Sequence, residues 1–402
     1  QNVGGVINFV TRAIPEKFSG EIGTTIEHAG HGGWKKLNQA FLGGTADNGL
    51  GVALLYSGVK GADYRDGNND NDIDDVLLKT HWQLTDSDQL AANFHYYDAY
   101  ADMPGGLTQA QYDDDPFQSV RDWDNFRGRR KDFSLKYTRQ VDDLTQFEVL
   151  TYYSDSFRGS SIAARNLRTI TSYPRDYHVF AVEPRVSRIF FAGPTTQEIG
   201  IGYRYLKEAM NERASQLALV DNVPTVRPGS DGHTYQDRTG GTEASAFYID
   251  DKIDVGNWTI TPGIRYEKID SEQKNLLKNS KDSGRYNASL PALNVIYPLT
   301  PSWNLYANTE GSFGTVQYSQ MGKAVQSGDI EPEKARTWEL GSRYDDGILR
   351  AELGAFLINF DNQYESNQQT DSVTARGKTR HKGIEAAIAY DLADLDPLLS
   401  GF

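Results

Sequence analysis

The sequence predicts an all-β protein, a transmembrane antiparallel β-barrel, and three observations support this prediction. Apolar and polar residues alternate with a period of two over many segments. The connections between these segments are alternately short and long. Hydrophobic residues make up only 38% of the 402 residues, and no stretch approaches the ~18 consecutive apolar residues of a membrane-spanning helix. A barrel strand spans with about 9–11 residues, of which every second one faces lipid, so this composition suits a barrel.

The alternation separates an apolar face from a polar face within each segment. In residues 257–267, the apolar face comprises Trp258, Ile260, Pro262, Ile264 and Tyr266. In residues 349–357, it comprises Leu349, Ala351, Leu353, Ala355 and Leu357. A hydrated lumen and a lipid exterior require this separation. Soluble β-sandwiches and propellers also alternate, so the connections must decide between these classes.

About 16 strands of spanning length follow one another between Ser19 and Ala389. The short connections are Ala46–Gly49, Thr85–Asp88, Val141–Leu144, Ala192–Thr195, Val255–Asn257, Leu299–Trp303 and Asp345–Gly347. The long ones are Gly61–Asp72, Ala99–Trp123, Gly159–Pro174, Asn211–Asp237, Ser271–Arg285, Ser312–Lys334 and Gln363–Ser372. Strict alternation places all the short turns at one end and all the long loops at the other. Outer-membrane barrels have this asymmetry, whereas sandwiches and propellers have no reason for it.

Two features favour a barrel of the 22-stranded plugged type over a closed barrel of the porin type. A short strand, Gly4–Arg12, precedes the first barrel strand and cannot span. The chain also stops without a terminal strand that carries an aromatic carboxyl-terminal signature. We therefore expect residues 1–15 to be the C-terminal remnant of a plug domain. Residues 16–402 would form part of the barrel wall, in a chain that lacks most of the plug and the last barrel strands.

Composition narrows the class further. The 23 Tyr, 17 Phe, 6 Trp and 38 Gly suit aromatic girdles and tight turns. There is no Cys, so no disulfide scaffold holds the fold. The formal net charge of −14 argues against a nucleic-acid partner. A site for an anionic ligand would need positive charge concentrated locally rather than over the whole chain.

Other clusters give no case for a metal, a cofactor or catalysis. The acidic run Asp66–Asp75, expected in an outside loop, lacks the spacing of a calcium-binding loop. His28 and His31 have no third ligand for zinc. No nucleophile-elbow pattern is present. We therefore expect a protein that is not an enzyme.

Three segments resemble TonB-dependent outer-membrane receptors. They are the plug strand Gly4–Arg12, the mid-barrel hairpin Pro291–Asn308, and the "PEKA…WELG" strand start Glu331–Gly341. Four further segments are similar to the ferric-citrate transporters of that family, namely Ala101–Leu107, Asp250–Gly263, Gly311–Gln320 and Thr374–His381. The resemblance implies TonB-driven uptake of ferric citrate, as cargo rather than cofactor, across the outer membrane of a Gram-negative bacterium. It implies TonB with ExbB and ExbD as partners, contact with outer-membrane lipid and lipopolysaccharide, and leaves open a sigma-regulator signalling partner acting through an N-terminal domain.

The resemblance also implies which residues bind the ligand. Ferric citrate is a compact polyanion, and arginine binds carboxylates through two parallel hydrogen bonds. Arg158 and Arg175 correspond to two citrate-binding arginines of the family, Arg158 at the outer end of one predicted strand and Arg175 at the start of the next. Arg238 corresponds to a third arginine only with a one-residue gap. Gln368 matches a ligand-contacting glutamine, with Gln369 as an alternative in the register.

Several alternatives stay open at this point. Arg129, Arg130 and Lys131 also lie near the predicted mouth, and the favoured interpretation for them is charge in the lumen or at the rim. The same kind of transporter could carry another carboxylate siderophore, a catecholate chelate or haem. Proteins of a different class would be a passive porin, an outer-membrane lipase or a soluble carbohydrate-binding β protein.

Overall fold

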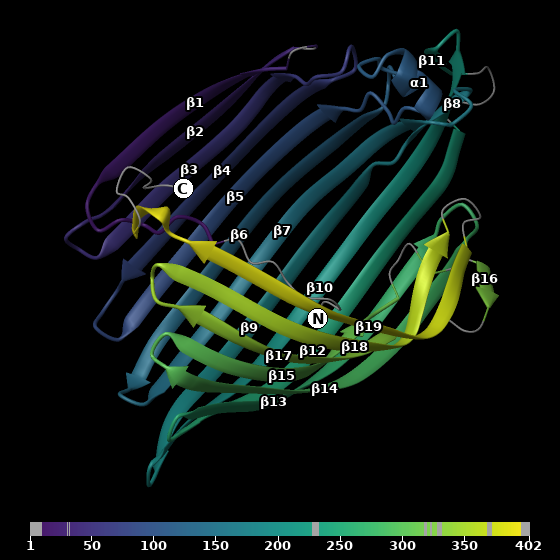
Figure 1. Cartoon of the computed structure of the whole chain (residues 1–402). Coiled ribbons are helices and arrows are strands. Elements are labelled where there is room, and N and C mark those ends of the chain that lie inside the picture. Colours follow the sequence, from purple (N-terminus) through teal and green to yellow (C-terminus); the bar gives the residue numbers. More distant parts are fainter. Residues whose placement is uncertain are drawn as a thin grey trace.

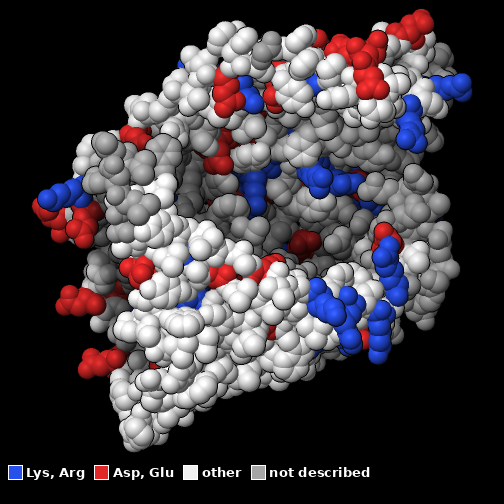
Figure 2. Space-filling view, in the orientation of Figure 1, with Lys and Arg blue, Asp and Glu red and all other residues white. Residues whose placement is uncertain are grey.

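The computed structural model describes residues 10–29, 31, 33–226, 233–316, 320–321, 324–327, 332–367 and 372–394. Its strands form one sheet that curves round, so that the green and yellow strands lie in front of the purple and blue ones (Figure 1). The space-filling view shows a hollow between these two parts of the sheet (Figure 2). Sixteen of the strands are long: β1 (Ser19–His28), β2 (Trp34–Thr45), β3 (Leu50–Ala62), β4 (Asp70–Gln83), β5 (Asp88–Asp102), β6 (Asn125–Asp142), β7 (Thr145–Ala163), β9 (Arg175–Ala192), β10 (Thr195–Val220), β12 (His233–Val255), β13 (Trp258–Asn275), β14 (Ser280–Thr300), β15 (Trp303–Gly314), β17 (Glu333–Asp345), β18 (Leu349–Asn367) and β19 (Ser372–Tyr390).

The remaining elements are short. They are the strands β8 (Thr169–Ser172), β11 (Val223–Thr225) and β16 (Ala324–Ser327), the helix α1 (Gln109–Asp114) and the 3-10 turn η1 (Leu392–Asp394). A capping box starts α1, because the Thr108 hydroxyl accepts from the Gln111 N–H and the Gln111 side chain accepts from the Thr108 N–H. β8, β11 and α1 gather at one end of the sheet, which is the end of the long connections (Figure 1).

Each long strand pairs antiparallel with the next long strand in sequence. The predicted fold class and the prediction of about 16 spanning strands are therefore confirmed. Of the described strands, only β16 pairs parallel, with the start of β19. Strands β1 and β19, at the two ends of this order, do not pair with each other in the described part of the chain.

The predicted asymmetry is confirmed at the end with the short turns and is partly wrong at the end with the long loops. Short turns join strands wherever they were predicted, with Gly193 and Gly256 at φ +62° and +58°, a region that favours glycine. The connection predicted as a long loop over 271–285 is instead a hairpin, because β13 continues to Asn275 and β14 starts at Ser280. Backbone groups outside the bilayer still need partners, and continued pairing supplies them.

The outer surface of the sheet carries a belt of apolar side chains. One row crosses seven strands in direct register, and each of its side chains is at least 36% exposed. Its members are Leu42, Leu54, Leu78, Phe94, Phe133, Tyr153 and Phe180. Exposed apolar side chains in such a row suit contact with lipid. No helix in the described part of the chain has the length and apolar content needed to cross a membrane.

The opposite face of the strands lines the hollow and carries polar side chains together with a few buried apolar ones, such as Ile269 and Leu290. On β13 the inward Glu267 and Ser271 are buried, whereas the outward Ile264 and Tyr266 are each 48% exposed. Glu267 accepts a 2.6 Å hydrogen bond from the Nε of its inward neighbour Arg265. Figure 2 shows Lys and Arg side chains gathered on the inner surface of the hollow. The period-two pattern of the sequence thus separates lumen from exterior, as predicted.

The segment before β1 contacts the inner wall. Arg12 forms a 2.8 Å ion pair with Glu21 on β1, and its guanidinium lies 3.9 Å from the centre of the Phe41 ring on β2. Lys79 on β4 donates to the backbone oxygen of Arg12 at 2.8 Å. Residues 10–15 therefore run inside the curved sheet. The assignment of residues 1–15 to a plug remnant stays a prediction, since residues 1–9 are outside the described ranges.

Candidate ligand site at the outer mouth

Four inward-facing residues lie side by side on four neighbouring strands. Arg158 on β7 is directly opposite Arg175 on β9. Arg175 is opposite Glu212 on β10, and Glu212 is opposite Arg238 on β12. Side chains alternate between the two faces of a strand, and all four residues are on the face opposite to that of the outward apolar row. The register of the sheet therefore brings together the three arginines that were predicted as ligand residues. We call these four residues the cationic row.

The cationic row is built around a fully buried carboxylate. Glu212 has no exposed side-chain area, while the side chains of Arg175 and Arg238 are 29% and 13% exposed. The Nε of Arg175 donates to Glu212 Oε1 at 2.6 Å, and the Nε of Arg238 donates to Oε2. Gln236 adds a 2.7 Å hydrogen bond to Oε2. Removing one partner of such a buried ion pair costs about 3–5 kcal/mol, so the two guanidinium groups hold Glu212 in place and are held by it.

Arg158 differs from the other two arginines because it is exposed and forms no ion pair with a described residue. Its guanidinium lies 5.8 Å from the centre of the Phe126 ring on β6. Three arginines and one glutamate leave the cationic row with a formal excess of two positive charges. This is the local concentration of charge that an anionic ligand requires, in a chain that is acidic overall.

The strands extend further outward than the sequence pattern predicted. β7 continues to Ala163, so Arg158 lies inside the strand rather than at its end. Arg238 lies inside β12 rather than before a strand. Arg175 begins β9, as predicted. The alternation of apolar and polar residues weakens where both faces of a strand are exposed to water, although backbone pairing continues there.

The other candidates fall elsewhere. Gln368 lies outside the described residues, so its role as a ligand contact stays a prediction. Arg130 faces inward and pairs with Asp132 at 2.6 Å. Arg129 and Lys131 are on the same face of β6 as Phe133 of the outward row, so they point away from the lumen. No group of three or more His, Asp or Glu side chains in the described ranges is arranged to hold a metal ion.

Sequence reasoning missed Glu212. The only signal available was an acidic residue at a lumen-facing position of the strand that contains Ile199 and Tyr203. Its importance depends on which residues of β9 and β12 stand opposite to it, and the sequence does not specify this register. The acidic run that was expected in a loop was also misplaced, because Asp70–Asp75 forms the start of β4, where Asp72 pairs with Lys60 at 3.2 Å.

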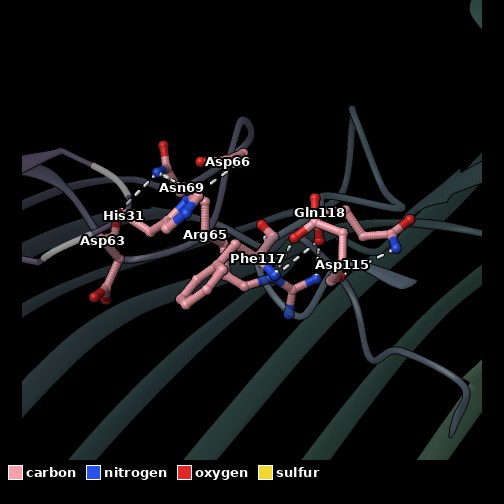
Figure 3. A network of polar contacts seen from close by, with 8 residues as sticks. All are labelled: His31, Asp63, Arg65, Asp66, Asn69, Asp115, Phe117 and Gln118. Carbon is pink, nitrogen blue, oxygen red and sulfur yellow. Dashed lines mark hydrogen bonds and ion pairs between the residues drawn. The ribbon is translucent and has the colours of Figure 1, made fainter. Parts of the chain in front are cut away.

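A polar network joins three of the long connections, those between β1 and β2, β3 and β4, and β5 and β6 (Figure 3). The His31 ring, between β1 and β2, stacks on Phe117, between β5 and β6, with centroids 4.1 Å apart. His31 also lies 3.8 Å from the Asp66 carboxylate, between β3 and β4. Arg65 of that connection is buried and donates from Nε to the backbone oxygens of Phe117 and Gln118. These contacts fix three neighbouring loops to one another.

The connection 103–124 is tied to its other neighbours as well. The indole N–H of Trp123 donates to the backbone oxygen of Asn222 at 2.6 Å. The buried Asp124 carboxylate accepts from the backbone N–H of Ala163, at the outer end of β7, at 2.6 Å. Burial raises the pKa of Asp124 above its ordinary value, although the hydrogen bond from Ala163 acts in the opposite direction. The loop that contains α1 therefore forms a fixed part of the mouth.

Comparisons with known proteins agree with this architecture. A family model described as TonB dependent receptor-like, beta-barrel, matches residues 80–402. The crystal structure of the ferric citrate transporter FecA in the unliganded form is similar at a TM-score of 0.89 and 52% sequence identity. That likeness covers 99% of this chain and 60% of the FecA chain. The ferric-catecholate import receptor Fiu from Escherichia coli K12 has a TM-score of 0.71 at 16% identity over 94% of this chain and 63% of its own, which shows the fold alone.

Curated relatives match shorter stretches. An uncharacterized TonB-dependent receptor of Haemophilus influenzae is 28% identical over 144 residues, which are 34% of this chain and 41% of its own length. The ferrioxamine B receptor of Salmonella typhimurium is 24% identical over 154 residues, 37% of this chain and 21% of its own. This chain therefore spans less than half the length of these two relatives. Proteins of this family are receptors rather than enzymes, as predicted. Because the family model extends over most of its length, the chain belongs to the TonB-dependent receptor β-barrel family of the bacterial outer membrane.

Proposed function

We propose that the protein containing this chain takes up a ferric chelate, and specifically ferric citrate, across the outer membrane. The observation that carries the proposal is the cationic row, in which Arg158, Arg175 and Arg238 stand on neighbouring strands of the inner wall. Carboxylate groups of a chelate suit guanidinium partners, because each can accept two parallel hydrogen bonds. The 52% identity to a ferric citrate transporter supports the same cargo.

The row favours an anionic ligand over a neutral one. Its formal excess of two positive charges lies at the wall of the hollow, where the side chains of Arg175 and Arg238 are mostly buried. Charge pairs in a partly desolvated site are stronger than on an open surface. Ferric citrate would be the cargo rather than a resident cofactor. Gln368 would add a neutral hydrogen-bonding contact.

Uptake against a gradient needs energy, which the outer membrane does not supply. We infer that TonB, acting with ExbB and ExbD, provides it through a plug inside the barrel. Contact of the exposed apolar row with outer-membrane lipid and lipopolysaccharide belongs to the same proposal. A sigma-regulator partner acting through an N-terminal domain would be a further, separate feature of the whole protein.

A binding titration tests the proposal directly. The full-length protein is purified in detergent and titrated with ferric citrate, with a ferric catecholate, with ferrioxamine B and with haem. The proposal expects saturable binding of ferric citrate that is tighter than that of the other three. Tighter binding of the catecholate, ferrioxamine B or haem would refute ferric citrate as the cargo but would still support a transporter of this class. Ion conductance without any chelate binding would indicate a passive channel instead.

A further inference from the structure

The contacts of Glu212 leave part of each neighbouring guanidinium group open. Arg175 and Arg238 both approach Glu212 through Nε, one at each carboxylate oxygen. Neither arginine forms a hydrogen bond through its terminal Nη atoms with a described residue. The terminal nitrogens are the ends that can receive a ligand oxygen. Glu212 thus engages the Nε of both arginines and leaves their terminal Nη atoms without a hydrogen bond to a described residue.

We infer that Glu212 is a positioning residue for the ligand, which acts by orienting Arg175 and Arg238 together; this rests on the proposed function. Without Glu212, the two positive side chains that flank its position would repel each other and sample several rotamers. A single buried carboxylate that accepts from both Nε atoms fixes the relative orientation of the pair before the ligand arrives. Pre-organised side chains lose less entropy on binding, which strengthens the complex.

The alternative role of Glu212 makes the opposite prediction. A carboxylate beside an anionic ligand lowers the positive potential of the site. If that were its main effect, removing it would tighten the binding of ferric citrate. If orientation dominates, removing it weakens binding although the site becomes more positive. The sign of the change in affinity therefore separates the two roles.

Gln236 supports the orienting role. Its side-chain amide donates to the same oxygen of Glu212 that accepts from Arg238, at 2.7 Å. Three donors around one fully buried carboxylate leave it a single arrangement, in which both guanidinium groups are fixed. A carboxylate present only to reduce charge would not need this third contact.

The experiment is a double-mutant cycle on the full-length protein in detergent. Affinity for ferric citrate is measured for Glu212→Ala in three backgrounds: wild type, Arg175→Ala and Arg158→Ala. In the wild type we expect Glu212→Ala to weaken binding by about fivefold or more. In Arg175→Ala we expect a clearly smaller weakening, because Glu212 then orients only Arg238 and its negative charge repels the ligand. In Arg158→Ala we expect the wild-type effect, because Arg158 forms no ion pair with Glu212.

Each outcome has one meaning. Equal weakening in the wild-type and Arg175→Ala backgrounds would show a general structural effect and would overturn the inference. Tighter binding by Glu212→Ala in the wild type would also overturn it, in favour of simple charge reduction. Unheated gel mobility of each variant monitors whether the barrel is folded. Absence of ferric citrate binding by the wild type would instead refute the proposed function, so the two failures are distinguishable.

Discussion

Truncation of Arg158 isolates one charged contact at the mouth with little effect on the fold. Arg158 is exposed and has no ion-pair partner among the described residues, so Arg158→Ala leaves no buried carboxylate without a cation. Apart from the contact with the Phe126 ring, only contacts with the ligand would be lost. A hydrogen bond to a charged group contributes about 1.5–3 kcal/mol. Since about 1.4 kcal/mol corresponds to a factor of ten, the expected loss of affinity for ferric citrate is about 10- to 150-fold.

The matched control for this change is Arg129→Ala. Arg129 lies on the adjacent strand β6, near the same height, but has the outward parity. Both variants remove one guanidinium group, so they change the net charge of the protein equally. A calorimetric or fluorescence titration of the purified full-length protein measures both affinities. The reasoning is refuted if Arg158→Ala binds as tightly as wild type, or if Arg129→Ala loses as much affinity as Arg158→Ala.

Three further predictions concern the wall, the loops and a turn. Phe133→Lys places a cation in the exposed apolar row and should destabilise the membrane-inserted barrel by about 2–4 kcal/mol, measured by unfolding from lipid vesicles, whereas the inward Ser134→Lys should have little effect. Arg65→Ala removes the donors to Phe117 and Gln118 and should speed amide hydrogen exchange in residues 63–69 and 115–120 while β12–β14 stays unchanged; equal exchange everywhere would contradict the loop network. The pKa of Asp346 lies below its ordinary value, chiefly because the carboxylate accepts from the Leu349 N–H at 2.7 Å, so order in the turn between β17 and β18 should be complete above the ordinary pKa and be lost as the pH falls through the lowered one. Hydrogen exchange in that turn, corrected for intrinsic rates, checks the last prediction, and Asp346→Asn should remove the acid dependence.

The fold was predictable because alternation and connection length are local properties of the sequence. Segments such as Trp258–Tyr266 specify which side chains face lipid, and the short turns at Gly193 and Gly256 specify one end of the barrel. The outer ends of the strands were less predictable, because a strand in water can be polar on both faces. The extension of β13 to Asn275 is an example.

The site was predictable only in part. The resemblance selected Arg158, Arg175 and Arg238 one at a time, but it did not place them in one row. Their juxtaposition depends on how each strand is shifted against the next, and this shift is a property of the whole barrel. Glu212 could not be found for the same reason. A slip of one residue between β9 and β10 would have turned it toward lipid.

The placement of the arginines inside strands has a consequence for engineering this receptor. Transplanting outside loops from a related protein would leave Arg158, Arg175 and Arg238 in place, because they belong to β7, β9 and β12. Such a chimera should keep its attraction for anionic chelates even if finer discrimination among them changed. Selectivity would be easier to redesign by replacing neighbouring strands of the wall together than by exchanging the outside loops.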